Sequence, residues 1–306
     1  MKYREKVKEG VLIWNQAFEK IGFKGALQVR QQQDNDEFDN NDTRHASIRW
    51  YVDTSDGALA IGPSRVDPRT GEILDADISF SDGWTRLPRR RAVEQRSSVA
   101  IERSNTPSLA TVMANQALLR GEGPGSCNYA DNAMEEVMFA LDLLQARGDI
   151  EPDSPEAEAI VMATLKDVVA HEVGHTLGLQ HNFRASGIHT LEQLEDKEFT
   201  KKNAFSGSVM EYNALNIAPK GRKQGEYVMS GIGPYDEWAI EYAYKPIDPA
   251  KEKDELLKIA SRSNEPLLAF ANDLDAGLGP VEGMDPEVNR RDLGADPLAF
   301  AERRMA

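Results

Sequence analysis

The hydrophobic pattern divides the chain into a helical start, a strand-rich stretch and a later set of helices. Apolar side chains recur at three- and four-residue steps over residues 2–21, which predicts an amphipathic helix that ends at Gly22. Short apolar or alternating runs, typical of strands, follow at 26–31, 48–52, 58–64 and 73–80. A turn sequence at 66–71 joins the last two of these strands.

The longest periodic stretch predicts a helix over residues 153–179. It is apolar nearly all round, and such a helix is buried. Its first residues, Asp153-Ser-Pro-Glu156, combine a capping box between Asp and Glu with a proline that suits a first turn. Another helix is predicted before it at 130–147 and one after it at 251–261, and the end of the chain is typical of loops with short helices.

Charge and hydropathy exclude some classes of partner. The chain holds 51 acidic and 36 basic residues, a net charge of −15, which would repel the phosphates of a nucleic acid. Arginines gather at 85–125, within a stretch, 85–150, that we interpret as an inserted helical segment. No apolar run is long enough to span a membrane, and the charged first residues do not form a signal peptide. We therefore expect either a cytoplasmic protein or a piece of a larger secreted chain.

Residues 171–181 carry the candidate chemistry and read His-Glu-Val-Gly-His-Thr-Leu-Gly-Leu-Gln-His. His171 and His175 are four residues apart, so a helix presents both imidazoles to one ion. Gly178 can adopt a positive φ, which ends the helix and lets His181 turn back as a third ligand. Three neutral imidazoles leave the fourth position of a tetrahedral zinc ion open for water, as a catalytic site requires.

Glu172 lies about 100° around the helix from the first histidine of this motif, so its carboxylate stays near the metal without binding it. It can take the proton of a water molecule that zinc makes more acidic. The alternative is a core helix with hydrogen-bonded histidines. Three of the five histidines fall in these eleven residues, which argues against that alternative. Of the other two, His45 is expected to be structural and His189 to be exposed.

The single cysteine, Cys127, excludes an internal disulfide. We interpret it as a free structural or incidental thiol; the alternative is that the thiol caps the zinc in a latent form. Residues 31–43 are acidic and amide-rich, and we expect a solvated loop there; a calcium loop is the alternative, although the segment has no fixed ligand spacing. Residues 272–277 have oxygen ligands near a glycine but lack the full EF-hand loop.

The histidine motif together with Ser208-Val-Met-Glu-Tyr212 resembles the metzincin clan of zinc peptidases. In that clan a tight turn containing a methionine lies beneath the histidines, and Met210, 29 residues after His181, matches it. Tyr212 matches the tyrosine that astacin-like and serralysin-like members place near the metal, where it binds zinc or the transition-state oxyanion; matrixins lack it. The resemblance implies an α+β fold with a mixed twisted sheet, an edge substrate-binding strand, a central zinc-binding helix, a Met-turn and a mostly helical C-terminal subdomain.

A wider resemblance is to a bacterial zinc-dependent metalloprotease family that is often described as matrixin-like. The similar segments are 171–186, 210–219 and 232–242, with 62–73 and 285–304. This resemblance implies the catalytic region of a larger exported protein, periplasmic, outer-surface or secreted. We expect an N-terminal catalytic subdomain at 1–181 and a C-terminal subdomain at 182–306.

The expected activity is hydrolysis of peptide bonds, with Glu172 as general base and then general acid; the clan implies an endopeptidase. An extended substrate would pair with an edge strand within residues 58–80. Two alternatives remain open. One is a zinc-loaded binding or assembly module without peptidase activity, and the other is a zinc hydrolase of non-peptide amides. No sequence feature indicates an oligomeric state or a cleavage specificity.

Overall fold

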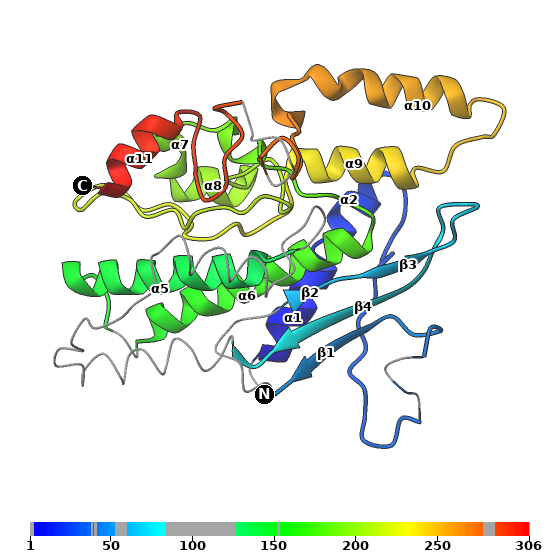
Figure 1. Cartoon of the computed structure of the whole chain (residues 1–306), viewed down its shortest axis with the longest axis horizontal. Helices are drawn as coiled ribbons and strands as arrows, with labels where there is room; N and C mark the ends of the chain where they lie inside the picture. Colours follow the sequence, from blue (N-terminus) through cyan, green and yellow to red (C-terminus); the bar gives the residue numbers. More distant parts are fainter. Residues whose placement is uncertain are drawn as a thin grey trace.

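The computed structural model describes residues 3–37, 39, 42–52, 60–83, 127–151, 154–277 and 285–305. The Arg-rich stretch 85–125 lies outside these residues, and so does Asp153. Figure 1 shows a small sheet at one end of the molecule, two long helices through its middle and a group of short helices above them. The predicted α+β class with a mixed sheet is confirmed.

The central element is helix α6 (Pro155–Thr176), most of whose residues are buried. Its N-cap is Ser154, whose side chain accepts a hydrogen bond from the Ala157 backbone N–H, so the predicted cap at Asp153 is wrong. The helix ends at Thr176, before the predicted end at 179, because the chain enters a turn in which Gly178 has φ of +95°.

The sheet has strand order β1–β4–β2, with β3 also paired to β4. Strand β1 (Ser47–Tyr51) runs parallel to β4 (Ile73–Ser81), with Ser47 opposite Asp77 and Tyr51 opposite Ser81. The short strands β2 (Ala60–Ile61) and β3 (Ser64–Val66) run antiparallel to β4, which makes the sheet mixed. The strands predicted at 48–52 and 73–80 are therefore confirmed. Of the strand predicted at 58–64, residues 58 and 59 lie outside the described residues, and the rest is divided between β2 and the first residue of β3.

The strand predicted at 26–31 is wrong, because this segment has no regular structure. The Asn15 side chain accepts a hydrogen bond from the Leu27 N–H at 2.8 Å and donates one to the Leu27 carbonyl at 3.0 Å. A helix side chain thus satisfies the backbone groups that a neighbouring strand would otherwise bond.

The helix predicted over 2–21 is divided into α1 (Tyr3–Leu12) and α2 (Asn15–Lys20). Trp14 stands at the break, fully buried, and its indole N–H donates to the Ala170 carbonyl of α6 at 2.9 Å. Helix α1 approaches α6 closely: a Cβ added to Gly10 would lie 2.7 Å from the Lys166 carbonyl and from Val169. Only glycine permits this distance between the two backbones.

The other helices complete the core. Helix α5 (Tyr129–Arg147) packs against α6 and confirms the prediction at 130–147. Among the described residues after His181 the regular elements are helices, joined by long irregular segments: α7 (Leu191–Leu194), α8 (Lys197–Asn203), α9 (Pro234–Tyr244), α10 (Glu252–Ala260) and α11 (Pro297–Met305), with short 3-10 turns at Ala185–Ile188, Ser261–Asn264 and Pro266–Leu268. One hydrophobic cluster includes residues of α1–α2, α6 and α11, and the subdomain division at 181 stays a prediction.

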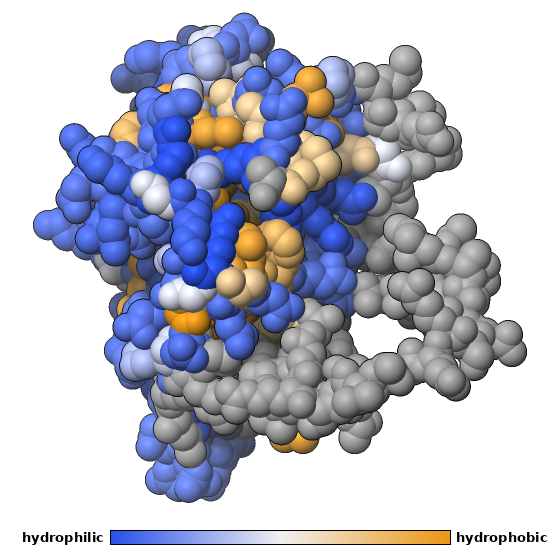
Figure 2. Space-filling model, turned by 90° about the vertical axis from the view of Figure 1, so that its left-hand side faces the viewer, coloured by the Kyte–Doolittle hydropathy of each residue, from blue (hydrophilic) through white to orange (hydrophobic). Residues whose placement is uncertain are grey.

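The surface is mainly hydrophilic on the face that Figure 2 shows, with apolar side chains in small groups. Among the described residues, no helix is both long and apolar enough to cross a membrane.

Replacing Gly10 by Ala should destabilise the protein by about 1–3 kcal/mol, because the new methyl group forces α1 away from α6. Chemical denaturation of the variant measures this loss. Lys8→Ala, at an exposed position of the same helix, is the matched control. Equal stability of the two variants would show that the helices separate without cost.

Candidate metal centre

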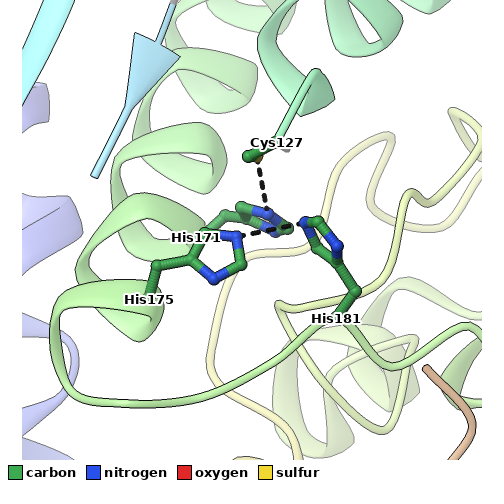
Figure 3. A group of neighbouring side chains, drawn as sticks. All are labelled: Cys127, His171, His175 and His181. Carbon is green, nitrogen blue, oxygen red and sulfur yellow. Dashed lines mark hydrogen bonds between the residues drawn. The ribbon is translucent and has the colours of Figure 1, made fainter. Parts of the chain in front are cut away.

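Three imidazoles converge beside helix α6 (Figure 3). His171 and His175 stand one turn apart on the helix, and His181 comes back to them after the turn at Gly178. The Nε2 atoms of His175 and His181 are 3.1 Å apart. Candidate ligand atoms of these three residues and of Cys127 all lie within 4.8 Å of one another. The structure thus brings together the three histidines that the sequence singled out.

Each of these imidazoles is held at its Nδ1 atom by an oxygen. His171 Nδ1 donates to the Val209 carbonyl at 2.7 Å, and His175 Nδ1 donates to the Leu179 carbonyl at 3.0 Å. His181 Nδ1 lies 2.8 and 3.0 Å from the two carboxylate oxygens of Asp273. Because an oxygen acceptor fixes the proton on Nδ1, the Nε2 lone pairs are left to face one another.

This donor set fits a zinc ion. Burial, with the nearby imidazoles, holds the pKa of His171 well below its usual range and lowers the pKa of His175 to about 4. Both rings are therefore neutral at neutral pH, as metal ligation requires. Neutral imidazole is among the preferred ligands of zinc, and three of them make a typical catalytic set.

Glu172 is fully buried next to the cluster. Its Oε1 lies 3.5 Å from the Cys127 sulfur, and its Oε2 has no hydrogen-bond partner within the described part of the chain. Without a metal ion, burial raises the pKa of Glu172 to about 8, and the positive charge of a zinc ion at the histidines would lower it again and favour the carboxylate. A buried carboxyl oxygen without a partner is costly unless a ligand or water uses it, so this residue is the candidate base.

The end of strand β2 touches the same glutamate. A Cβ added to Gly62 would lie 2.6 Å from the Glu172 backbone carbonyl and 3.1 Å from its Oε2. Any other residue here would push the edge of the sheet away from α6. The sheet edge and the candidate base are therefore in direct contact.

Met210 packs against α6 at Gly174, which lies between His171 and His175 in the sequence, and is fully buried. A Cβ added to Gly174 would lie 2.3 Å from the Met210 sulfur, so the methionine occupies the space that this glycine leaves on α6. Asp236 holds the turn: it accepts hydrogen bonds from the Ser208 hydroxyl and from the N–H groups of Val209 at 2.9 Å and Gly233 at 2.7 Å. This turn supplies the Val209 carbonyl that orients His171.

The Tyr212 hydroxyl lies at the rim of the cluster, 3.2 Å from His181 Nε2. It accepts a hydrogen bond from the Asn128 N–H at 3.0 Å and donates one to the Cys127 sulfur at 3.6 Å. This position suits the metal-side role that the resemblance implies for Tyr212.

Tyr129 supports the site from α5. Its ring packs on His171 with centroids 4.4 Å apart and on Tyr212 at 5.0 Å. Its hydroxyl donates a hydrogen bond to the buried Asp167 of α6 at 2.5 Å. Burial raises the pKa of Asp167 to about 7, although the tyrosine hydrogen bond acts in the opposite direction.

Sequence reasoning missed Asp273 and Asp236 as orienting residues. Asp273 belongs to the oxygen-rich segment 272–277, and its carboxylate faces His181; calcium there stays a prediction. For Asp236 the sequence offers one signal: an acidic residue in the first turn after a Gly-Pro pair, which indicates the start of a helix but no contact with the metal site.

His189 was expected to be exposed, but it is buried against Phe199, with ring centroids 4.9 Å apart.

Comparison with known families gives one match. A family model described as Met-zincin matches residues 153–306, half of the chain, from the start of α6 through the third histidine to the end. The chain belongs to this family and hence to the metzincin clan of zinc metallopeptidases. Neither curated proteins nor solved structures give a significant match.

Replacing Asp273 by Asn should weaken zinc binding by about 10–100-fold, because His181 loses the carboxylate that orients it and makes it more basic. Competition with a chromogenic chelator measures the zinc affinity. Asp275→Asn, at an exposed position of the same loop, should bind zinc like the parent protein. If both variants keep the parental affinity, the carboxylate has no role in holding the metal.

Asp167 should make stability depend on pH. Because its folded pKa of about 7 exceeds the ordinary aspartate value of 3.8, the folded state binds the proton more tightly between these values. The free energy of unfolding of the parent, relative to Asp167→Asn, should therefore fall as pH rises from about 4 to about 7, by up to about 4 kcal/mol. Urea denaturation across this range measures the difference. Asp142→Asn, at an exposed site on α5, controls for the lost charge, and a flat difference for Asp167→Asn would contradict the assignment.

Proposed function

We propose that this chain is a zinc-dependent endopeptidase, with His171, His175 and His181 as zinc ligands and Glu172 as general base. The observation that carries the proposal is the meeting of three Nε2 atoms beside a buried glutamate whose Oε2 lacks a partner. Membership of the Met-zincin family supports the same class of reaction.

Bound zinc would polarise the scissile carbonyl and make a water molecule more acidic. Glu172 takes the proton of that water and then delivers it to the leaving amine. The Tyr212 hydroxyl, whose oxygen already accepts from the Asn128 N–H, donates its proton in a hydrogen bond to the developing oxyanion. Met210 and Gly178 are structural: the first packs against α6 and the second turns the chain.

The edge formed by β2 and β3 is the proposed substrate-binding strand. These strands lie at one end of the described sheet, and Gly62 between them touches Glu172. A peptide that pairs with this edge in extended form would carry its backbone past the candidate base. Edge binding of this kind places the scissile bond inside a longer peptide, which favours endopeptidase over exopeptidase action.

Two wider features of the proposal rest on resemblance. We propose that residues 1–181 and 182–306 are the two subdomains, because the third ligand lies where they join and Asp273 reaches it from the second. Export as part of a longer precursor follows from the similarity to matrixin-like bacterial enzymes and stays a prediction.

Replacing Glu172 by Gln should reduce peptide cleavage by about 10²–10⁴-fold while zinc stays bound, because the amide cannot take a proton. Cleavage of a peptide library, followed by mass spectrometry, measures turnover, and elemental analysis measures zinc. Glu156→Gln, at an exposed position of the same helix, is the matched control.

A zinc-loaded Glu172→Gln protein that cleaves as fast as the parent would refute the role of the glutamate. The parent treated with a chelator should lose cleavage and regain it with zinc. A zinc-loaded parent that cleaves no peptide would point instead to a binding module, or to a hydrolase of other amides if small amide substrates are cleaved.

A further inference from the structure

A closed network of hydrogen bonds holds Tyr212 at both ends. The Tyr212 carbonyl accepts from the Arg291 N–H at 2.9 Å, and its hydroxyl accepts from the Asn128 N–H at 3.0 Å. The Arg291 guanidinium donates to the Asn132 side chain, which donates to the Asn128 carbonyl at 2.8 Å and so closes the network. We infer that Asn132 and Arg291 are positioning residues that hold the Tyr212 hydroxyl at the rim of the metal centre. The inference rests on the oxyanion-binding role proposed for this hydroxyl.

The guanidinium fixes the orientation of the Asn132 amide. Arginine offers only donors, so the amide oxygen faces it and the amide nitrogen is left for another acceptor. That nitrogen lies 2.8 Å from the carbonyl oxygen of Asn128 and 3.0 Å from its side-chain oxygen. Asn132 is only 4% exposed, and a buried amide with its partners satisfied makes its surroundings rigid. The peptide that carries the N–H to the phenol is therefore held in place.

Asn128 departs from the usual behaviour of a residue at a helix start. It is the N-cap of α5, yet its side chain makes no capping hydrogen bond. An asparagine at this position normally bonds the N–H groups of the first turn, and this stabilises the helix. Here its side-chain oxygen accepts from Asn132 instead. The start of α5 thus gives up a local stabilising bond for the network around Tyr212.

Arg291 departs from a second local rule. Its φ of +65° lies in the left-handed region, which favours glycine and is unfavourable for a residue with a Cβ. Such a conformation persists only where the surroundings determine it strongly. The backbone N–H of Arg291 is bonded to Tyr212, and its guanidinium is bonded to Asn132 and paired with Glu135 at 3.0 Å. Both ends of the residue are therefore fixed, and glycine could supply only the first of these bonds.

The network leaves the hydroxyl proton free to change its acceptor. With its oxygen held by the Asn128 N–H, the hydroxyl can rotate its proton from the weak acceptor Cys127 Sγ to a substrate oxygen. A donor that is held in place before the reaction needs no reorganisation during it. The bond from the N–H also polarises the O–H group and makes it a stronger donor. Asn132 and Arg291 thus act on the reaction through Tyr212.

Amide hydrogen exchange at Asn128, followed by NMR on the whole chain, tests the network without any need for activity. Asn132→Asp keeps an acceptor for Arg291 but loses the donor to Asn128, so the Asn128 N–H should exchange at least about tenfold faster than in the parent. Arg291→Gly should act in the same direction. This second variant should fold, because glycine suits a positive φ and retains the N–H that bonds Tyr212.

Glu135→Gln is the matched control, because it removes only the exposed ion pair of Arg291 and should leave the exchange rate at Asn128 unchanged. Parental exchange rates at Asn128 in both Asn132→Asp and Arg291→Gly overturn the inference.

Peptide cleavage then shows whether the network acts through the phenol. Asn132→Asp should lower kcat by about tenfold with KM unchanged, because the hydroxyl bonds the substrate oxygen only in the transition state. In a Tyr212→Phe background the same substitution should change kcat by less than about twofold. An equal loss in both backgrounds shows that Asn132 acts elsewhere and overturns the inference. If no protein cleaves peptides, the parent included, while exchange at Asn128 follows the expected pattern, the proposed peptidase function fails and the positioning network stands.

Discussion

The hydrogen bonds that the three Nδ1–H groups donate are the constraint on which the site depends. Their acceptors belong to three separate segments: the Val209 carbonyl, the Leu179 carbonyl and the Asp273 carboxylate. Without them each ring could rotate or exchange its tautomer, and the Nε2 lone pairs would no longer point to one place. The buried α6, the turn held by Asp236 and the loop at 272–277 can each be understood as support for one of these three bonds.

Much of this arrangement could be predicted because it is local in sequence. The spacing of His171 and His175 follows from the helical repeat, and the return of His181 follows from a glycine at a positive φ. The strands at 48–52 and 73–80 and the helices at 130–147 and 251–261 carry their periodicity within a few residues. Met210 and Tyr212 were predicted by resemblance to a clan, since nothing in their own neighbourhood indicates a metal.

What could not be predicted depends on contacts between distant segments. Asp273 meets His181 from 92 residues away, and neither periodicity nor composition carries that information. Asn15 captures the backbone of Leu27, which removes a strand that alternation alone favours. Trp14 reaches Ala170 and divides a helix whose apolar pattern runs through the break. In each case a tertiary hydrogen bond overrides a local preference.

The bond between Asp273 and His181 also sets an order of events during synthesis. A ribosome releases the chain from its first residue onward, so the three histidines emerge long before residue 273. Until that carboxylate arrives, the third imidazole lacks the group that orients it. A nascent chain therefore carries the ligand motif in an incomplete state, and full metal affinity appears only after the C-terminal segment has folded back over the site. Timing of this kind would keep a hydrolytic centre inactive while the chain that bears it is still unfolded and open to attack.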